Sequence, residues 1–273
     1  MNMPIDQLNE ERAAFAFNQQ SAIFDEQYAA NGIVHYKRKR VRNHLLQYLR
    51  PGSNILELNA GTGDDAIFLA QHGHYVHATD IAIGMQQQLM TKVVRQQLTD
   101  HISNELCSFT ALQNLQNKGP FDCIFSNFAG LNCTGELQTV LDSFDILLKP
   151  GGVVVLVILP NFCLWETALM VKGKFKTATR RFFSGNGRKA AIDGAAFTCW
   201  YYPPGFIVKQ LKNKFSLLKI EGLCSMVPPS YIENFAEKYP KSFSWLSKME
   251  ERFADRWPWK YTGDYYIISM QKK

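Results

Sequence analysis

The 273-residue sequence has few cysteines, and their spacing gives them no evident structural task. The six cysteines include no CxxC pair and no zinc-ligand spacing, and several lie within apolar runs. This pattern argues against a disulfide framework and a zinc module, so we expect free, buried thiols. His72, His74 and His77 straddle a predicted helix end and a strand, where their side chains would diverge. No metal site is predicted.

Long hydrophobic runs are absent as well. The longest, from Val153 to Leu159, is far shorter than a membrane-spanning helix requires. Near the N-terminus, Asp6, Glu10 and Glu11 stand where a signal peptide would be basic and then apolar. We therefore expect a soluble, cytoplasmic protein without a transmembrane segment.

Neither positive nor negative side chains are in large excess, with 30 Lys or Arg against 24 Asp or Glu. The net charge is +6, and lysines and arginines are spread along the chain, so no nucleic-acid partner is predicted. Five cations between Lys37 and Arg42 would be spread around a helix and form a solvated face. Residues 172–189 hold seven Lys or Arg, no acid, and Phe175, Phe182 and Phe183. We interpret this stretch either as a mobile lid that meets an anionic or lipid-like partner or as a solvated loop.

The most informative pattern runs from Ser53 to Asp80. A short apolar strand, residues 54–58, leads through the glycine turn of residues 59–63 into a helical pattern, and a second strand ends at Asp80. Glycines permit positive φ and let a ligand approach the backbone closely. The free amides at the start of a helix favour negative charge, and a carboxylate at the end of the second strand suits a ribose diol. The unit predicts a nucleoside-binding crevice.

The turn Glu57-Leu58-Asn59-Ala60-Gly61-Thr62-Gly63 resembles the E/D-x-G-x-G-x-G turn of class I S-adenosylmethionine-dependent methyltransferases, with Asn59 in place of the first glycine. Residues 120–128 resemble the fourth motif of that family. Residues 148–152, Leu-Lys-Pro-Gly-Gly, are followed by an apolar strand and are similar to the turn that precedes the next strand in that family. Gly61 to Ala66 also fits the dinucleotide pattern G-x-G-x-x-G/A. An NAD-dependent oxidoreductase therefore remains an alternative, as does a non-catalytic protein that binds S-adenosylmethionine or S-adenosylhomocysteine.

The resemblance implies S-adenosyl-L-methionine as cofactor. Glu57 would support its ammonium end, Asp80 would accept the ribose hydroxyls, and Asn127 would offer a backbone carbonyl to its amine. Many family members have an acid just after the third strand that holds the adenine amino group, and Ala111 stands about there in this sequence. The implied cofactor site comprises Glu57, Asn59, Ala60, Gly61, Gly63, Asp80, Ile81, Met85, Ala111 and Asn127.

Strands that alternate with helices predict an α/β fold. The resemblance implies a three-layer Rossmann-like sandwich whose mostly parallel, seven-stranded sheet has an antiparallel last strand. Residues 1–273 would form one methyltransferase domain, which comprises an N-terminal helical cap (1–50), a cofactor-binding core (51–160), an insertion or lid (161–202) and a completion of the sheet (203–273). We expect a break in the cap near Asn31-Gly32, a third strand from Glu105 to Thr110, and one long helix from Tyr231 to Phe253.

The expected reaction is methyl transfer to a small-molecule or lipid-like acceptor. Such transfer depends on positioning and needs few catalytic groups, so the catalytic residue is left unassigned. Candidate lining residues of the substrate site are Phe24, Tyr28, His35 and Tyr36, although these side chains could simply pack the helices onto the sheet. The side chains chemically able to act as a base are His35, Tyr36, Glu166, Tyr201 and Tyr202. The sequence predicts neither the acceptor nor an oligomeric state.

Overall fold

The computed structural model describes residues 5–173, 175–182, 184–192, 194–232 and 234–273. Its centre is a seven-stranded sheet in the order β3-β2-β1-β4-β5-β9-β8. The strands are β1 (Asn54–Leu58), β2 (Tyr75–Asp80), β3 (Ile102–Leu106), β4 (Phe121–Ser126), β5 (Leu148–Ile158), β8 (Phe215–Leu223) and β9 (Tyr265–Lys272). Neighbouring strands pair in parallel except at β9, which is antiparallel to both β5 and β8. The predicted mixed sheet is confirmed.

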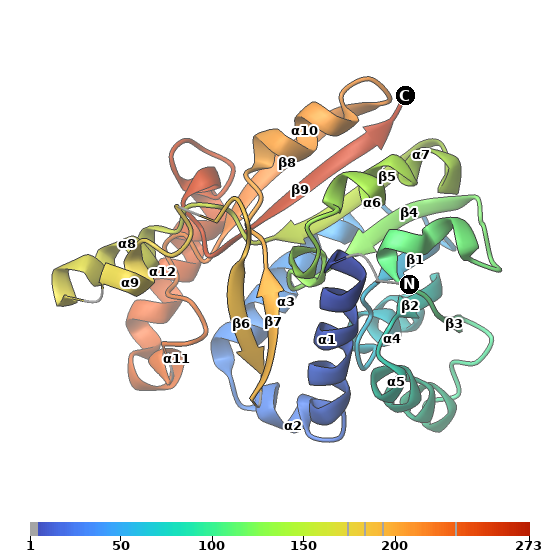
Figure 1. Cartoon of the computed structure of the whole chain (residues 1–273), viewed down its shortest axis with the longest axis horizontal. Coiled ribbons are helices and arrows are strands. Elements are labelled where there is room, and N and C mark those ends of the chain that lie inside the picture. The colour runs from blue at the N-terminus through green and yellow to red at the C-terminus, as the bar shows by residue number, and fades with distance from the viewer. Residues whose placement is uncertain (1–4, 174, 183, 193, 233) are drawn as a thin grey trace.

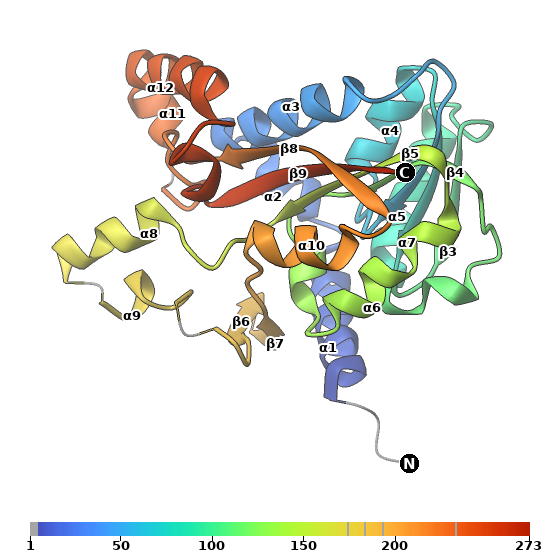
Figure 2. The ribbon, with the colours of Figure 1, turned by 90° about the horizontal axis from the view of Figure 1, so that it is seen from above.

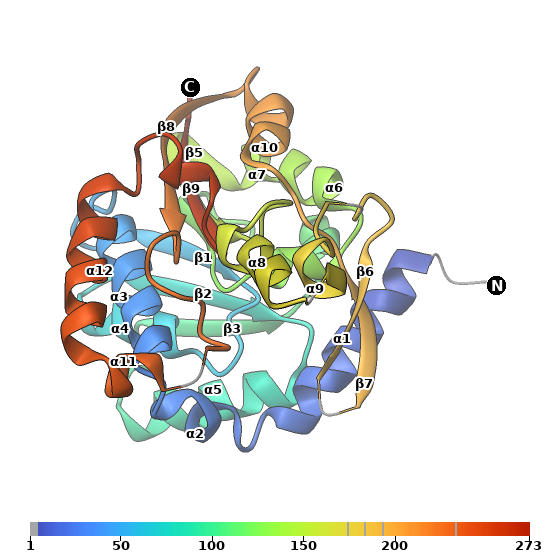
Figure 3. The same cartoon turned by 90° about the vertical axis from the view of Figure 1, so that its left-hand side faces the viewer.

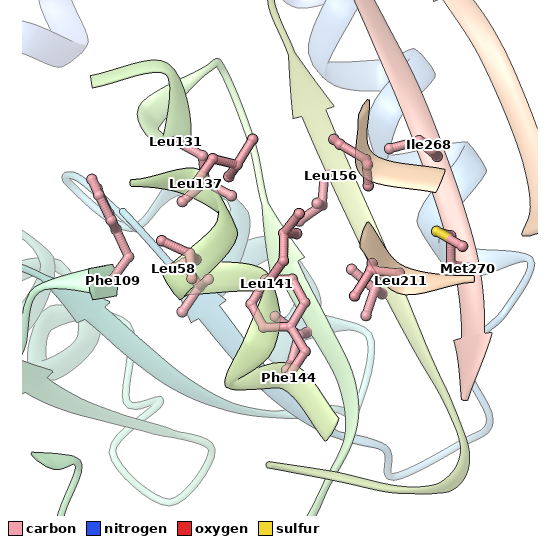
Figure 4. Packing of buried hydrophobic residues seen from close by; sticks show 14 of the residues in the cluster. Leu58, Phe109, Leu131, Leu137, Leu141, Phe144, Leu156, Leu211, Ile268 and Met270 are labelled. Atoms are coloured by element: carbon pink, nitrogen blue, oxygen red, sulfur yellow. The ribbon is translucent and has the colours of Figure 1, made fainter. Parts of the chain in front are cut away.

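Helices cover both faces of this sheet (Figures 1 and 2). One face carries α3 (Gly32–Leu46), α4 (Asp64–Gln71) and α5 (Ile83–Arg95), and the other carries α6 (Leu137–Asp142), α7 (Phe144–Leu147) and α10 (Pro204–Leu211). Figure 4 shows the second face, where Leu141 and Phe144 pack against Leu58 and Leu156. Strands β1 and β4 and the second half of β5 are largely buried between these helices, and most of their residues are apolar. The predicted three-layer sandwich is confirmed.

The N-terminal helices are α1 (Ile5–Gln20), α2 (Phe24–Ala29) and α3. Asn31 caps α3, because its side-chain oxygen accepts hydrogen bonds from Ile33 N (3.0 Å) and Val34 N (3.1 Å). The predicted break near Asn31-Gly32 is therefore confirmed.

A two-stranded hairpin, β6 (Arg188–Ile192) and β7 (Ala195–Cys199), lies along α1 (Figures 1 and 3). Asn9 of α1 fixes this contact, since its Nδ2 donates to Thr198 O (3.0 Å) and its Oδ1 accepts from Thr198 N (2.6 Å). The same Nδ2 donates to Cys133 O (2.7 Å), beyond the end of β4. Helix α1 is thus held between the hairpin and the loop after β4, above the carboxyl ends of the central strands.

Two of the predicted elements are wrong in extent. The expected long helix from Tyr231 to Phe253 is instead α11 (Phe235–Lys238) and α12 (Pro240–Phe253), because Pro240 lacks an N–H and fits only the first turn of a helix. The expected strand from Glu105 to Thr110 is shorter and earlier in the chain, at β3. A 3-10 helix, η1 (Phe109–Asn114), follows it, capped by Ser108, whose hydroxyl accepts from Thr110 N (3.1 Å).

Two arginines of the basic stretch 172–189 form ion pairs with acids of the same protein. It follows α8 (Leu164–Ala168) and η3 (Leu169–Lys172), and it includes α9 (Phe175–Ala178). Arg181 is 3% exposed and donates to Glu166 Oε1 (2.7 Å) and to Asp264 Oδ1 (2.6 Å). Arg180 Nε also donates to Glu166, at 2.9 Å. Arg181 thus fastens the stretch to Asp264, just before β9, and both arginines form ion pairs with Glu166 of α8.

Lys174 and Phe183 lie outside the described residues, as does the side chain of Lys172. Phe175 and Phe182 are exposed. Within the described residues, none of the helices combines the length and the apolar character that crossing a lipid bilayer requires.

Candidate functional site

A cavity that is partly open to solvent lies at the carboxyl ends of β1, β2 and β4, beneath α1. Ligands of open α/β sheets bind at this edge. Eight of the ten predicted site residues line it: Glu57, Asn59, Ala60, Gly61, Asp80, Ile81, Met85 and Asn127. The segments that follow β1, β2 and β4 therefore meet at the carboxyl edge of the sheet, as expected for parallel strands.

The other two predicted residues, Gly63 and Ala111, do not line the cavity. Gly63 caps α4 with a φ of 80°, and a Cβ on it would lie 2.5 Å from Leu89 Cγ of α5. Its glycine is needed for the turn and for helix packing. Ala111 lies within η1, and Phe109 of the same element lines the cavity in its place.

Asp80 holds the glycine turn from the end of β2. Its Oδ2 accepts from Gly61 N (2.9 Å), and its Oδ1 accepts from Ala82 N (2.8 Å). Burial raises the pKa of the carboxyl, although the backbone hydrogen bonds favour its charged form. Each oxygen has lone-pair capacity left for a ligand donor.

Glu57 presents an unpartnered carboxylate oxygen at the cavity wall. The side chain is 3% exposed, and its Oε2 has no hydrogen-bond partner in the described residues. Burial raises the pKa of this carboxyl well above its usual value, and the neighbouring carboxylate of Asp65 raises it further. A buried acceptor without a donor is costly unless a ligand satisfies it, and a cationic ligand would also offset the local negative charge.

Of the five cations of α3, Lys39 is exposed, and the other four are buried or half-buried. Arg42 Nε donates to Asp65 Oδ1 (2.6 Å), and Arg38, which lines the cavity, pairs with Asp64. Arg40 is buried and donates to Glu221 (3.1 Å) on the far side of the helix. The prediction of a solvated cationic face is therefore wrong, since these acids come from elements distant in sequence.

Asn59 adopts a φ of 48°, which asparagine tolerates better than most residues do. Its Oδ1 accepts from Ser126 Oγ (2.6 Å), and its Nδ2 donates to Asn127 O (3.0 Å). A Cβ at Gly130 would collide with this side chain. Asn59 thus ties the turn after β1 to the loop after β4, and it already uses one lone pair of the Asn127 carbonyl that was predicted to meet the cofactor.

The sequence comparisons point to a methyltransferase domain. Residues 55–152 match the model of a methyltransferase domain. The chain is 25% identical over 154 residues to an uncharacterized methyltransferase of Synechocystis sp., covering 55% of this chain and 69% of that one. It is 29% identical over 160 residues to the demethylmenaquinone methyltransferase of Lactococcus lactis, covering 56% of this chain and 61% of the relative. The structure of magnesium protoporphyrin IX methyltransferase from Synechocystis with bound S-adenosylmethionine superposes with a TM-score of 0.60 and 13% identity over 100% of both chains.

Residues 55–152 form a methyltransferase domain, and the fold of the chain is that of S-adenosylmethionine-dependent methyltransferases of known structure. The methyltransferase of known structure binds S-adenosylmethionine. In this chain, the unpartnered oxygen of Glu57 is chemically suited to a cationic group of a ligand in the cavity. A dinucleotide fits less well, because five carboxylates line the cavity and would repel a pyrophosphate: Glu10, Glu57, Asp64, Asp65 and Asp80.

The sequence reasoning missed much of the methyltransferase's cavity wall. Phe24 lines the cavity as predicted, whereas Tyr28, His35 and Tyr36 do not. Tyr36, on α3, points toward α12 instead, where its hydroxyl donates to Glu250 (3.2 Å). The missed residues are Glu10, Ala13, Ala14, Phe17, Arg38, Asp64, Asp65, Phe109, Gly130 and Cys133. The spacing of Glu10, Ala14 and Phe17 along one helical face was the available signal for the contribution of α1.

The side chains that could have acted as a base do not line the methyltransferase cavity. Glu166 accepts a hydrogen bond from Arg181, and the hydroxyl of Tyr202 donates to Thr134 O (2.5 Å). His35 bonds through a ring nitrogen to Ala29 O (2.7 Å), and Tyr201 lies under the Arg181 guanidinium. Among the described lining residues, the titratable groups are the five carboxylates, one arginine and Cys133, whose thiol pKa is raised by burial.

Proposed function

We propose that this enzyme transfers the methyl group of S-adenosylmethionine to a small, largely apolar acceptor bound between α1, α2 and the loop after β4. The proposed cofactor site rests on the buried, unpartnered oxygen of Glu57 beside the glycine turn. The proposed acceptor site rests on the apolar side chains above that turn, which we call the apolar roof: Ala13, Ala14, Phe17 and Phe24.

The cofactor lies along the strand ends. Glu57 holds its ammonium group, and Arg38, at the same end of the cavity, meets its carboxylate. Asp80 accepts the ribose hydroxyls, while Ile81 and Met85 border adenine. When bound, the cofactor supplies a methyl group already activated by the sulfonium.

The backbone of Ala60 and Gly61 runs beneath the methionine portion of the cofactor, where a larger side chain would obstruct it. The carbonyl of Asn127 has a second lone pair for the cofactor amine, besides the one that Asn59 uses. Phe109, rather than Ala111, completes the wall on the adenine side.

The cavity limits which acceptors fit. No described lining residue is a histidine, tyrosine or lysine, so the strongest base available is a carboxylate. The acceptor is therefore a nucleophile that loses its proton readily, such as a thiol, an amine, an acidic hydroxyl or an acidic carbon. Positioning in line with the sulfur–methyl bond supplies most of the rate.

A second surface supports a lipid-like acceptor. An apolar groove runs between α8 and α12 and includes Trp165, Trp245 and Met249. Lys241 and Lys248 flank Trp245 on the exposed side of α12. Tryptophan between lysines is suited to the interface between an anionic lipid surface and water.

A screen that measures S-adenosylhomocysteine production tests this function. Thiol, amine, phenol and quinol acceptors would be compared, each with short and long apolar tails, and Asp80→Ala would serve as the cofactor-binding control. We expect turnover with at least one apolar acceptor and none in the control. Tight S-adenosylmethionine binding without product across the whole panel would favour a non-catalytic binding protein.

A further inference from the structure

The adenine side of the cavity contains a carboxylate that comes from an unexpected element. The family often has an acid just after the third strand, where this chain has Ala111. In the folded chain, Glu10 of α1 occupies that neighbourhood. Ser108 Oγ donates to Glu10 Oε2, and Thr110 Oγ1 donates to the same oxygen at 3.1 Å. These two hydroxyls flank Phe109, which lines the cavity together with Glu10.

Burial makes a carboxylate at this position costly. Glu10 is 4% exposed, and burial raises its pKa while hydrogen bonds from Ser108, Thr110 and Thr134 act in the opposite direction. The neighbouring acid Glu136 raises it further. A glutamine could pin α1 to the strand end without that cost, so the retained charge indicates a ligand that benefits from a strong acceptor. A carboxylate offers about four lone-pair sites, and three hydroxyl donors leave one for the cavity.

We propose that Glu10 accepts a hydrogen bond from the exocyclic amino group of adenine and so replaces the acid missing at Ala111. This inference rests on the proposed placement of the cofactor. It makes α1 a part of both subsites, because Ala13, Ala14 and Phe17 of the same helix line the apolar roof. Cofactor binding then fixes the helix against which the acceptor packs.

Calorimetric titration with two ligands tests the assignment. S-adenosylhomocysteine carries the adenine amino group, whereas S-inosylhomocysteine has a carbonyl oxygen there, which would face the Glu10 carboxylate. The wild-type protein should prefer the adenine compound by about tenfold or more, since a buried acceptor opposite another acceptor is left unpaired. Glu10→Gln should bring the ratio of the two dissociation constants close to one, because an amide can face either group. Glu11→Gln, at the exposed neighbouring acid, is the matched control and should keep the wild-type ratio.

The outcomes separate the two proposals. If the wild-type protein binds neither compound, the cofactor site itself is wrong. If it binds S-adenosylhomocysteine and Glu10→Gln, with unchanged circular dichroism, keeps the wild-type ratio, Glu10 only pins the helix and the inference is overturned. Should Glu10→Gln unfold, Ser108→Ala provides the second variant, since it frees the carboxylate from one anchor. We then expect a several-fold loss of discrimination, and an unchanged ratio would equally overturn the inference.

Discussion

Replacing Asp80 by alanine should weaken cofactor binding without unfolding the protein. The carboxylate accepts from Gly61 N (2.9 Å) and Ala82 N (2.8 Å), and its remaining lone pairs are available to the ribose hydroxyls. The substitution removes charged acceptors from the ligand and leaves the two backbone donors without their partner. Such losses cost about 1 to 3 kcal/mol, so the dissociation constant of S-adenosylhomocysteine should rise about 5- to 150-fold.

Isothermal titration of S-adenosylhomocysteine into wild-type protein, Asp80→Ala and Asp80→Asn measures this effect. The asparagine variant keeps one acceptor oxygen and should lie between the other two. Glu105→Gln is the control, because Glu105 lies near the end of the adjacent strand β3 but does not line the cavity. An unchanged dissociation constant in a folded Asp80→Ala protein would refute the assignment of Asp80 to the ribose.

Three further predictions concern other parts of the molecule. The raised pKa of Glu57 means that this carboxyl must lose its proton before it can bind the ammonium group. The affinity of the wild-type protein for S-adenosylhomocysteine should therefore rise with pH through that pKa, and Glu57→Gln should remove this dependence. Titrations across pH that give parallel profiles for the two proteins would contradict this. Arg181→Gln leaves the buried carboxylate of Asp264 without its cation, while Glu166 keeps only Arg180. The substitution should lower the unfolding free energy by about 3 to 5 kcal/mol, measured by urea denaturation, and a change below 1 kcal/mol would be a contrary result. Trp245→Ala should reduce sedimentation with phosphatidylglycerol vesicles several-fold, and equal sedimentation of both proteins would remove the support for a lipid-like acceptor.

The cofactor half of the site could be predicted because its determinants are local. Residues 53–80 contain a strand, a glycine turn, a helix and a second strand in one continuous segment, and parallel pairing of β1 with β2 and β4 then places Asp80 and Asn127 beside the turn. Strand order itself did not have to be known, because carboxyl ends of parallel strands meet at one edge. Pro240 is also a local signal and marks the start of α12, but the predicted single helix from Tyr231 to Phe253 overlooked it.

The roof and the charge network could not be predicted, because their partners are remote in sequence. Arg181 meets Asp264 83 residues away, and Glu10 meets Ser108 98 residues away. A run of cations has the same appearance in the sequence whether it is solvated or neutralised by distant acids. The tertiary fold alone decides this, and here it buries Arg40 and Arg181.

Thermal unfolding with added ligands tests the central claim most directly. A ligand at one hundred times its dissociation constant stabilises the folded state by about 2.7 kcal/mol, which corresponds to a shift of about 5 to 10 °C for a chain of this size. We predict such shifts with S-adenosylmethionine and S-adenosylhomocysteine and none with NAD. A shift with NAD, and none with either methionine-derived ligand, would contradict the account.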